Sequence, residues 1–315
     1  MCDQTPRHKT MRIGIIGTGV MGRNHLRVVD SIPELRLSAA MDINRDNLET
    51  ACAPYHVKQF KNHRLMAEEV DAVMVSTPTE SHFEIGEFFL NMGKHVLIEK
   101  PISMSLEEAD ELIRIADDRK LTLAVGHLER FNPAVQYINS FIDKPLFIEI
   151  QRLGSFSSRS LDVDVILDLM IHDIDLILQW DRSPLRQINA SGIPIVSNKI
   201  DIANVRLEFD SRLVVNMTAS RVSQKKTRKL RIFQRNNYFS IDYNKQRVKK
   251  FSLKGGNILE EVPEIPPVEP LYNLWMNFYR SITTGKNLNV TGAESRSALK
   301  VAKQIVDKID TQIDL

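Results

Sequence analysis

The first part of the chain alternates short apolar runs with stretches whose apolar residues recur at helical spacing. The runs are rich in Val, Ile, Leu and Ala, which is typical of parallel strands that are buried on both faces. They predict strands at 12–16, 35–41, 72–76, 95–98 and 122–125. The stretches between them predict helices near 21–30, 45–53, 81–91 and 106–119. This α/β alternation predicts a doubly wound parallel sheet, as in a Rossmann domain, with right-handed crossovers.

The helix at 106–119 also has a start signal in its sequence. Ser105 and Glu108 have the spacing of a capping box, in which each side chain binds the backbone N–H of the other residue. We therefore expect the helix to begin directly after Ser105.

Beyond residue 128 the pattern changes from alternation to a succession of strands. Helices are predicted near 132–141 and 164–180, with a strand at 146–152 between them. Strand-like runs joined by short turns follow at 187–196, 202–209, 213–219, 230–234, 238–242 and 246–251. This spacing predicts a largely antiparallel open sheet. A proline-rich loop at 262–270 and helices near 271–284 and 293–310 end the chain.

These patterns divide the chain into three parts. We expect an N-terminal extension at 1–10, a Rossmann domain at 11–128 and an α+β domain at 129–315. The second domain would carry the catalytic, substrate-binding and oligomerisation surfaces. We expect part of its open sheet face to be apolar and to pack against another subunit, because such a face is not stable in water.

Composition excludes several classes of protein. Of the 315 residues, 43% are apolar and 26% are charged, and the net charge is +2, which suits a globular enzyme and gives no strong field for nucleic acid or membrane. Cys2 and Cys52 have no metal-binding or redox spacing, which favours a reducing, cytoplasmic setting. No apolar run approaches the ~18 residues of a membrane span, and residues 1–10 lack the apolar core of a signal peptide.

One cationic run stands out against this balance. It interrupts the predicted pattern of strands and comprises Arg221, Lys225, Lys226, Arg228, Lys229 and Arg231. With little aromatic interleaving, it is interpreted as a solvated turn or strand edge rather than a nucleic-acid site.

A glycine-rich motif follows the first predicted strand and opens the first helix. Gly17, Gly19 and Gly22 form G-x-G-x-x-G, in which Thr18, Val20 and Met21 fill the variable positions. Glycines at these positions allow a tight turn, close approach of a pyrophosphate and close helix–strand packing. A bare glycine turn before a helix is the alternative interpretation.

An acidic residue at the end of the second strand adds to this motif. Asp42 lies twenty residues beyond Gly22, where a carboxylate binds the hydroxyls of an adenosine ribose and repels a 2′-phosphate. The cofactor expected is therefore NAD rather than NADP, although the nearby Arg45 softens the preference. Residues 11–128 are thus predicted to be an NAD-binding Rossmann domain.

Two further polar segments follow predicted strands of the first domain. One is Ser76-Thr77-Pro78 with His82 close behind, and the other is Glu99-Lys100-Pro101. Open α/β sheets bind ligands at the carboxyl ends of their strands, so both segments are candidates for contact with the cofactor.

The predicted helix at 164–180 is strongly apolar but carries one polar stripe. The stripe consists of residues three or four positions apart: Asp164, Asp168, His172, Asp175 and Gln179. A largely buried helix with such a stripe is expected to face a substrate cleft. Two alternatives are a purely structural Asp168–His172 pair and an i, i+4 metal pair, and the second is disfavoured because no third ligand cluster is evident.

Together these segments resemble the Gfo/Idh/MocA oxidoreductases, which include glucose–fructose oxidoreductase and inositol dehydrogenases. The resemblance covers most of the chain from Met11 onward. It is carried by Gly17–Gly22, Thr77-Pro78, Glu99-Lys100-Pro101, Arg130-Phe131-Asn132-Pro133 and the pair Asp168 and His172.

The resemblance implies roles for individual residues. Lys100 would lie between the nicotinamide and the substrate and stabilise the reacting oxygen, while His172 takes the hydroxyl proton and Asp168 orients the imidazole or binds a neighbouring hydroxyl. The reverse assignment, with Lys100 as the base, stays open. His127, Arg130 and Arg159 are the candidate substrate-binding residues, and no metal is expected.

The stretch 156–176, taken with 126–133, resembles a subgroup that acts on nucleotide-linked amino sugars. This implies oxidation at C3 of UDP-N-acetylglucosamine to a ketone, which a partner aminotransferase then aminates toward a diamino sugar for lipid A. Alternatives are a free-sugar or inositol dehydrogenase and a nicotinamide-binding sensor without turnover. The resemblance also implies a homodimer or homotetramer.

Overall fold

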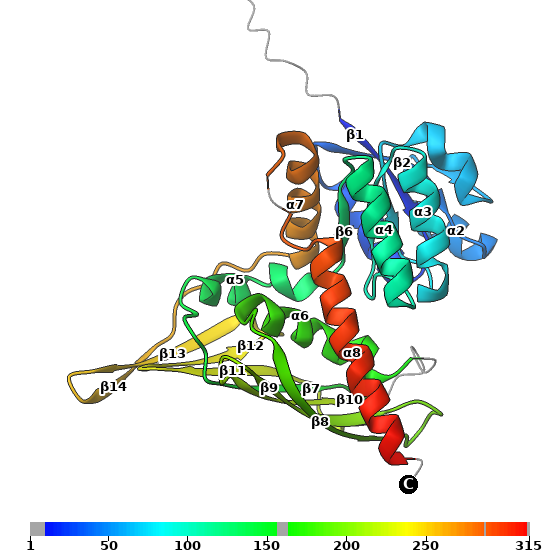
Figure 1. Ribbon diagram of the computed structural model, residues 1–315. Coiled ribbons are helices and arrows are strands. Elements are labelled where there is room, and N and C mark those ends of the chain that lie inside the picture. Colours follow the sequence, from blue (N-terminus) through cyan, green and yellow to red (C-terminus); the bar gives the residue numbers. More distant parts are fainter. Residues whose placement is uncertain (1–9, 156–162, 287, 314–315) are drawn as a thin grey trace, which may run out of the picture. The chain divides into compact units, whose positions relative to one another are not determined.

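The structure is a computed structural model that describes residues 10–155, 163–286 and 288–313 (Figure 1). The chain divides into two compact units. The first runs to Gly126 and includes Leu271–Arg296, and the second comprises His127–Pro270 and the segment from Ser297 onward. The single boundary expected at residue 128 therefore differs from the structure in one segment, because 271–296 folds with the N-terminal unit.

The first unit contains a six-stranded, entirely parallel sheet in the order β3-β2-β1-β4-β5-β6, the strand order of a Rossmann fold. Its strands are β1 Met11–Ile16, β2 Leu35–Met41, β3 Lys58–Phe60, β4 Ala72–Val75, β5 His95–Ile98 and β6 Leu123–Val125. Its helices are α1 Val20–Asp30, α2 Arg45–Cys52, α3 His82–Asn91, α4 Leu106–Asp118 and α7 Pro270–Thr284. Two 3-10 helices, η1 His63–Glu69 and η2 Thr79–Ser81, flank β4. The doubly wound parallel sheet is confirmed, and β3 is an addition to it.

Local sequence signals explain these elements well. All four residues of β4 are buried, as the continuous apolar run predicts for a central parallel strand. The capping box of α4 is also present, because Glu108 N–H donates to Ser105 Oγ at 3.1 Å while Glu108 Oε2 accepts from Ser105 N–H at 3.2 Å.

The second unit contains an eight-stranded sheet in the order β14-β13-β12-β11-β7-β10-β9-β8. The strands are β7 Phe147–Leu153, β8 Leu185–Ile193, β9 Ile202–Phe209, β10 Val214–Ser220, β11 Thr227–Gln234, β12 Asn237–Asp242, β13 Arg247–Lys254 and β14 Asn257–Glu261. Every neighbouring pair is antiparallel except β7 and β10. The largely antiparallel open sheet is thus confirmed.

Helices cover one face of this sheet (Figure 1). They are α5 Pro133–Asn139, α6 Ile171–Trp180 and the part of α8 Gly292–Ile313 that belongs to this unit, with a short 3-10 helix, η3 Leu128–Phe131, before α5. The buried sheet residues on this side include Ile148, Ile150, Leu230, Ile232 and Phe239. The helix predicted at 164–180 is α-helical only from Ile171, because its first turns, η4 Ile166–Met170, form a π-helix.

The opposite face of the sheet carries both apolar and polar rows of side chains. One apolar feature of this face, here called the aromatic row, consists of the cross-strand neighbours Phe147, Phe233, Tyr238 and Phe251. Their ring centroids lie 4.6–5.8 Å apart, and Tyr238 stacks between Phe233 and Phe251. The next row along the same strands is polar, with Glu149 paired to Arg231 at 3.3 Å.

The cationic run lies partly in a turn, as the sequence interpretation has it, because Arg221, Lys225 and Lys226 fall between β10 and β11. The rest of the run corrects that interpretation. Arg228, Lys229 and Arg231 lie within β11, an interior strand between β7 and β12. Each arginine is near an acid of the same unit, since Arg231 pairs with Glu149 and Arg228 lies 3.9 Å from Glu129. Long basic side chains are therefore compatible with this strand.

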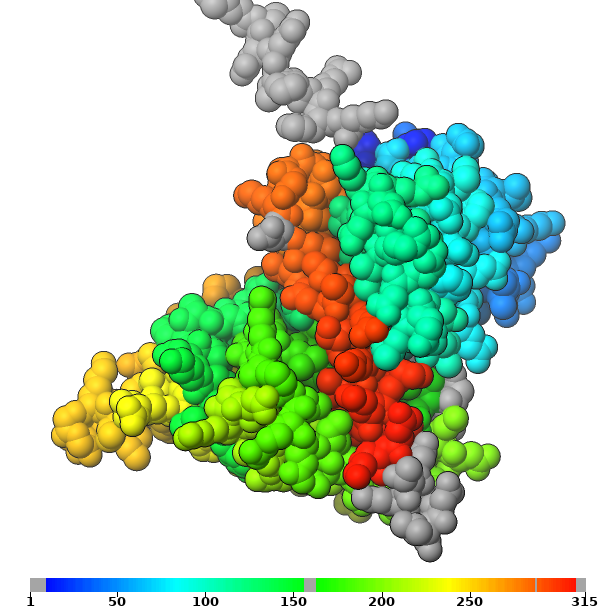
Figure 2. Space-filling view, viewed as in Figure 1, coloured from blue at the N-terminus to red at the C-terminus, as the bar shows by residue number. Residues whose placement is uncertain are grey.

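Edge strand β14 was not predicted either. All five of its residues are exposed, and the β13–β14 hairpin projects from its unit (Figures 1 and 2). None of the helices in the described ranges has the length and apolarity that a membrane span needs.

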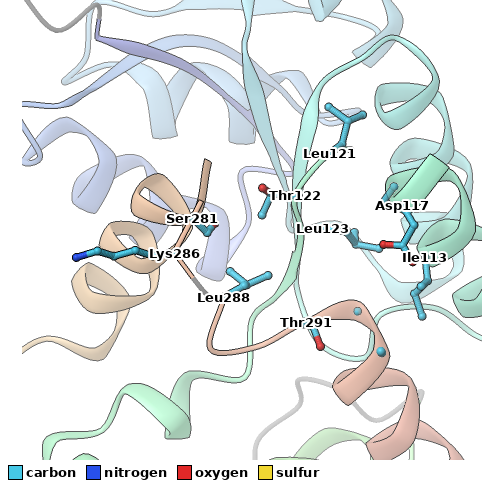
Figure 3. A pocket seen from close by; sticks show the side chains of 12 residues that line it. Ile113, Asp117, Leu121, Thr122, Leu123, Ser281, Lys286, Leu288 and Thr291 are labelled. Atoms are coloured by element: carbon cyan, nitrogen blue, oxygen red, sulfur yellow. The ribbon is translucent and has the colours of Figure 1, made fainter. Parts of the chain in front are cut away.

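A hollow of about 430 Å³ lies at the start of β6 in the first unit. Figure 3 shows Ser281, Lys286 and Leu288 on one side of it and Ile113 and Asp117 on the other. Because Leu121 and Thr122, which line it, precede β6, this hollow is at the amino edge of the sheet, away from the strand ends that carry the candidate site.

Candidate active site

The three glycines of the motif meet different surroundings. Gly17 has φ +87°, and a Cβ there would lie 2.7 Å from the Ser76 carbonyl oxygen. A Cβ on Gly22 would lie 1.9 Å from the Gly17 carbonyl oxygen, so the backbone of the loop leaves no room for a side chain at this position. A Cβ on Gly19 would meet no atom within 4 Å. Gly17 and Gly22 therefore allow the tight turn and helix packing, while the backbone at Gly19 stays open to a ligand.

A cavity of about 430 Å³ opens beside this loop at the carboxyl edge of the sheet. Among the residues expected to contact the cofactor, it is lined by Gly17, Gly19, Asp42, Ser76, Thr77 and Pro78. Further lining residues, which the sequence did not single out, are Met41, Ile43, His63, Glu80, Ser81, Glu84 and Ile85. Most of these lie next to the predicted strand ends, and that proximity is the signal that could have found them.

Asp42 is held in one orientation by its own loop and by the glycine motif. Its Oδ2 accepts hydrogen bonds from the Thr18 N–H at 2.6 Å and the Thr18 hydroxyl at 3.0 Å. Its Oδ1 accepts from the Asn44 N–H at 2.8 Å. A carboxylate has acceptor sites for about four hydrogen bonds, so capacity remains for ribose hydroxyls.

The other residues near the motif are at the surface of the loop or support it. Val20 is exposed, and Met21 is half-buried. The Arg45 guanidinium is paired with Glu49 at 2.6 Å. Ser76 Oγ donates to the Gly17 carbonyl at 2.7 Å, which ties the end of β4 to the glycine loop. An open backbone, an oriented carboxylate and a cavity between them fit a bound NAD.

His82 joins the two polar segments that follow β4 and β5. Its Nδ1 lies 2.9 Å from the Pro101 carbonyl oxygen, and its Nε2 lies 2.9 Å from the Thr77 carbonyl oxygen. The side chain is buried, and this burial lowers its pKa. His82 therefore links the segment that contains Thr77 to the segment that contains Lys100.

Glu99 and Lys100 come directly after β5, at the same sheet edge. The Glu99 carboxylate is buried, and its Oε2 accepts a hydrogen bond from the Lys100 N–H at 3.3 Å. Lys100 is half-buried.

In the second unit, His172 lies at the start of α6, directly after the π-helical turn that contains Asp168. The His127 ring meets the His172 ring edge to face, with centroids 5.9 Å apart. His127 is fully buried, and its Nδ1 lies 3.9 Å from Asp175 Oδ2. The structure thus brings two of the predicted residues, His127 and His172, into contact.

Arg130 is a buried member of this cluster. Its Nε and Nη2 donate to the two carboxylate oxygens of Asp175 at 2.6 and 2.7 Å, and it is 4% exposed. This bidentate pair makes Arg130 a support for the helix that carries His172, whereas contact with substrate stays a prediction. Arg159, the third candidate for substrate binding, lies outside the described residues.

A second buried pair on the same helix was not predicted. The Arg152 guanidinium binds both oxygens of Asp173 at 2.7 Å and Glu129 at 2.9 Å, and the Tyr243 hydroxyl donates to Asp173 at 3.2 Å. Burial raises the pKa of Asp173, although Arg152 acts in the opposite direction. Acids in an otherwise apolar helix need partners, and that requirement was the signal available in the sequence.

Two residues of the polar stripe make structural contacts within the second unit. Asp164 accepts a hydrogen bond from the Ile200 N–H at 2.9 Å, and Asp175 is fully buried against Arg130. These two residues fix the segment that carries Asp168 and His172. Within the described ranges, no group of three or more His, Cys, Asp or Glu side chains could hold a metal ion.

Comparisons with known proteins agree with this arrangement. Residues 11–127 match a model of the Gfo/Idh/MocA oxidoreductases, described as an oxidoreductase family with an NAD-binding Rossmann fold. UDP-N-acetylglucosamine 3-dehydrogenase of Acidithiobacillus ferrooxidans is 33% identical over 94% of this chain and 96% of its own length. Inositol 2-dehydrogenase of Rhizobium meliloti is 27% identical over 67% of this chain and 66% of its own length.

Solved structures give the same result. The Acidithiobacillus ferrooxidans enzyme GnnA, a UDP-N-acetylglucosamine 3-dehydrogenase, superposes with a TM-score of 0.91 over 96% of this chain and 99% of its own. A levoglucosan dehydrogenase in complex with NADH has the same fold, with a TM-score of 0.87 and 16% identity over 96% of this chain and 98% of its own. The chain belongs to the Gfo/Idh/MocA family of oxidoreductases, whose Rossmann domain binds NAD.

Proposed function

We propose that this protein oxidises the C3 hydroxyl of UDP-N-acetylglucosamine to a ketone with NAD as the oxidant. The observation that carries the proposal is the similarity of both units, at 33% identity over almost the whole length, to a UDP-N-acetylglucosamine 3-dehydrogenase. The match to inositol 2-dehydrogenase covers only two thirds of the chain at lower identity. The match to the UDP-N-acetylglucosamine 3-dehydrogenase covers 94% of this chain and therefore extends over most of the second unit, which favours the nucleotide sugar.

We propose that Lys100, Asp168 and His172 act together on the substrate. When bound, NAD supplies the acceptor for the hydride that leaves C3. The hydroxyl proton passes to the His172 imidazole, and the O–H bonding electrons form the second bond of the ketone. The Lys100 ammonium stabilises negative charge on the oxygen during this step, and Asp168 orients the imidazole or a neighbouring hydroxyl.

The residues around His172 suit this role. Arg130 with Asp175, and Arg152 with Asp173, anchor α6 through two buried bidentate pairs. Rigid support of this kind keeps a catalytic side chain within the small tolerance that proton transfer requires.

The finer parts of the proposal concern the pathway. A 3-keto sugar is the substrate that a transaminase needs to install an amine at C3, so an aminotransferase is the partner reaction we propose, leading to a diamino sugar for lipid A. We place the reaction in the cytoplasm, where NAD and nucleotide sugars are available. A homodimer or homotetramer is part of the same proposal.

The test is formation of NADH from NAD with UDP-N-acetylglucosamine, compared with N-acetylglucosamine, UDP-glucose and myo-inositol. We expect turnover with the nucleotide amino sugar and a product ketone at C3 by NMR. His172→Ala and Lys100→Ala should each lower turnover by at least about 10²-fold with near-normal NADH affinity. His56→Ala and Lys120→Ala, which change exposed residues of the first unit, are the controls.

Each contrary result has a distinct meaning. Faster turnover of myo-inositol would favour a free-polyol dehydrogenase, the alternative supported by the inositol 2-dehydrogenase match. NADH binding without turnover of any of these compounds would indicate a nicotinamide sensor. Normal turnover in both folded alanine variants would place the chemistry elsewhere.

A further inference from the structure

A buried chain of hydrogen bonds in the first unit leads from α7 to the segment that carries Lys100. The Trp275 Nε1–H donates to His25 Nδ1 at 3.0 Å, and His25 Nε2 lies 3.0 Å from Glu99 Oε1. Trp275 and His25 have no exposed surface, and Glu99 is 8% exposed. The chain ends where Glu99 Oε2 accepts the Lys100 N–H at 3.3 Å.

The order of donors and acceptors in this chain fixes the protonation of His25. An indole N–H is only a donor, so His25 Nδ1 must be an acceptor and carries no proton. The ring proton is then on Nε2, which donates to Glu99. A neutral imidazole with one defined tautomer therefore separates the indole from the carboxylate.

The Glu99 carboxylate is held from several sides. Its Oε1 lies 3.0 Å from His25 Nε2, and its Oε2 accepts the Lys100 N–H at 3.3 Å. Gly126 leaves room for the group, because a Cβ there would lie 3.0 Å from Glu99 Oε2. The Glu99 carboxylate thus has little freedom to rotate.

We propose that Trp275 and His25 are positioning residues for Lys100. They hold the Glu99 carboxylate in one orientation, and its Oε2 in turn fixes the backbone amide from which the Lys100 side chain extends. The inference rests on the proposed role of Lys100 in turnover. It assigns a function to α7, whose residues come long after the rest of the site in the sequence.

Trp275→Phe is the most selective test, since it keeps an aromatic ring and removes the N–H. With NAD and UDP-N-acetylglucosamine, kcat should fall about 10-fold while both KM values stay within about two-fold, because misplacement of a reacting group lowers the rate more than binding. The matched control is Trp180→Phe, which changes the only other tryptophan. Trp180 donates to Asn139 at 2.8 Å in the second unit, and its loss should leave kcat unchanged.

Substitutions of His25 separate positioning from simple packing. His25→Gln retains a donor for Glu99 and an acceptor for Trp275, so it should keep kcat within about three-fold of the wild type. His25→Leu keeps the bulk but no polar atom and should lower kcat at least about 10-fold. Equal kcat values for the folded fractions of both variants would show that His25 only fills space, and the inference would be wrong.

A spectroscopic measurement tests the chain of hydrogen bonds without any substrate. In ¹⁵N-labelled protein, His25, assigned by its absence in His25→Gln, should give the signals of a neutral Nε2–H tautomer at neutral pH. An Nδ1–H tautomer or an imidazolium would overturn the inference. Because this readout needs no turnover, a failure of the proposed substrate or of the Lys100 role is distinguishable from a failure of the positioning chain.

Discussion

The carboxylate of Asp42 receives the backbone N–H of Thr18 at 2.6 Å, which joins the second residue of the glycine motif to the end of the neighbouring strand. One side chain thus shapes the loop where a pyrophosphate binds and lies where an adenosine ribose binds. Changes at Asp42 should therefore affect coenzyme binding in two ways at once.

Asp42→Ala should weaken NADH binding by about 10- to 100-fold, the loss expected for hydrogen bonds to a charged acceptor. The preference for NADH over NADPH should narrow, because the charge that repels a 2′-phosphate is removed. Titration with both coenzymes measures this. Asp46→Ala, which removes an exposed carboxylate four residues later, is the control. Tighter binding of NADPH than NADH by the wild type would contradict the assigned role.

Arg130→Met should lower the free energy of unfolding by about 3–5 kcal/mol, because it leaves the Asp175 carboxylate buried without its bidentate partner. The double variant with Asp175→Leu should recover most of this loss. Urea unfolding measures both, and Arg64→Met, which breaks an exposed pair with Glu84, should cost at most about 1 kcal/mol. Unchanged stability with a raised substrate KM would instead make Arg130 a substrate contact.

Low pH should weaken the hydrogen bonds by which the Asp201 carboxylate holds residues 195–197 in the second unit. Its buried carboxylate accepts the N–H groups of Ile195, Val196 and Ser197, and these bonds outweigh burial and lower its pKa to about 2 from 3.8. A lowered pKa stabilises the folded state above the unfolded value, and that contribution disappears as pH falls through the folded value.

Asp201→Asn should therefore lose about 2 kcal/mol at neutral pH, and its difference from the wild type should shrink between about pH 4 and pH 2. Calorimetry across this range measures the effect. Asp210→Asn, which removes an exposed carboxylate of the same unit, is the comparison. A constant difference at all pH values would assign the loss to the hydrogen bonds alone.

The aromatic row should be part of a subunit interface, because it is a continuous apolar feature of a sheet face that helices leave open. The wild type should be a dimer or tetramer by light scattering at micromolar concentration. Tyr238→Lys with Phe251→Lys should lower the mass while circular dichroism is preserved. Tyr272→Lys, on α7 in the first unit, should not change the mass. A monomeric wild type would rule this interface out.

Elements with strong local signals could be predicted from the sequence. Continuous apolar runs located β1, β2, β4, β5 and β6, and Ser105 with Glu108 located the start of α4. Elements with weak local signals could not. The strand Lys58–Phe60 has three residues, two of them polar, and Asn257–Glu261 is exposed throughout, so neither shows a buried periodicity.

The site shows the same division. Gly17, Gly19, Asp42 and Ser76–Pro78 line one cavity at the carboxyl edge of the sheet. Side-chain partners distant in sequence were not predictable, because no local pattern pairs Arg152 with Asp173. The part of the cationic run that lies in β11 was misinterpreted for a related reason: the acids near Arg228 and Arg231 lie on other segments of the chain.

The inclusion of 271–296 in the first unit has a consequence for biosynthesis. The ribosome completes residues 1–126 first, yet Trp275 and the other buried residues of α7 emerge only after the entire second sheet. Until then, His25 lacks its indole partner and the apolar surface that α7 covers is open to solvent. The nascent chain therefore cannot finish the N-terminal unit in order, and premature termination before α7 should yield an aggregation-prone fragment rather than an independent coenzyme-binding domain.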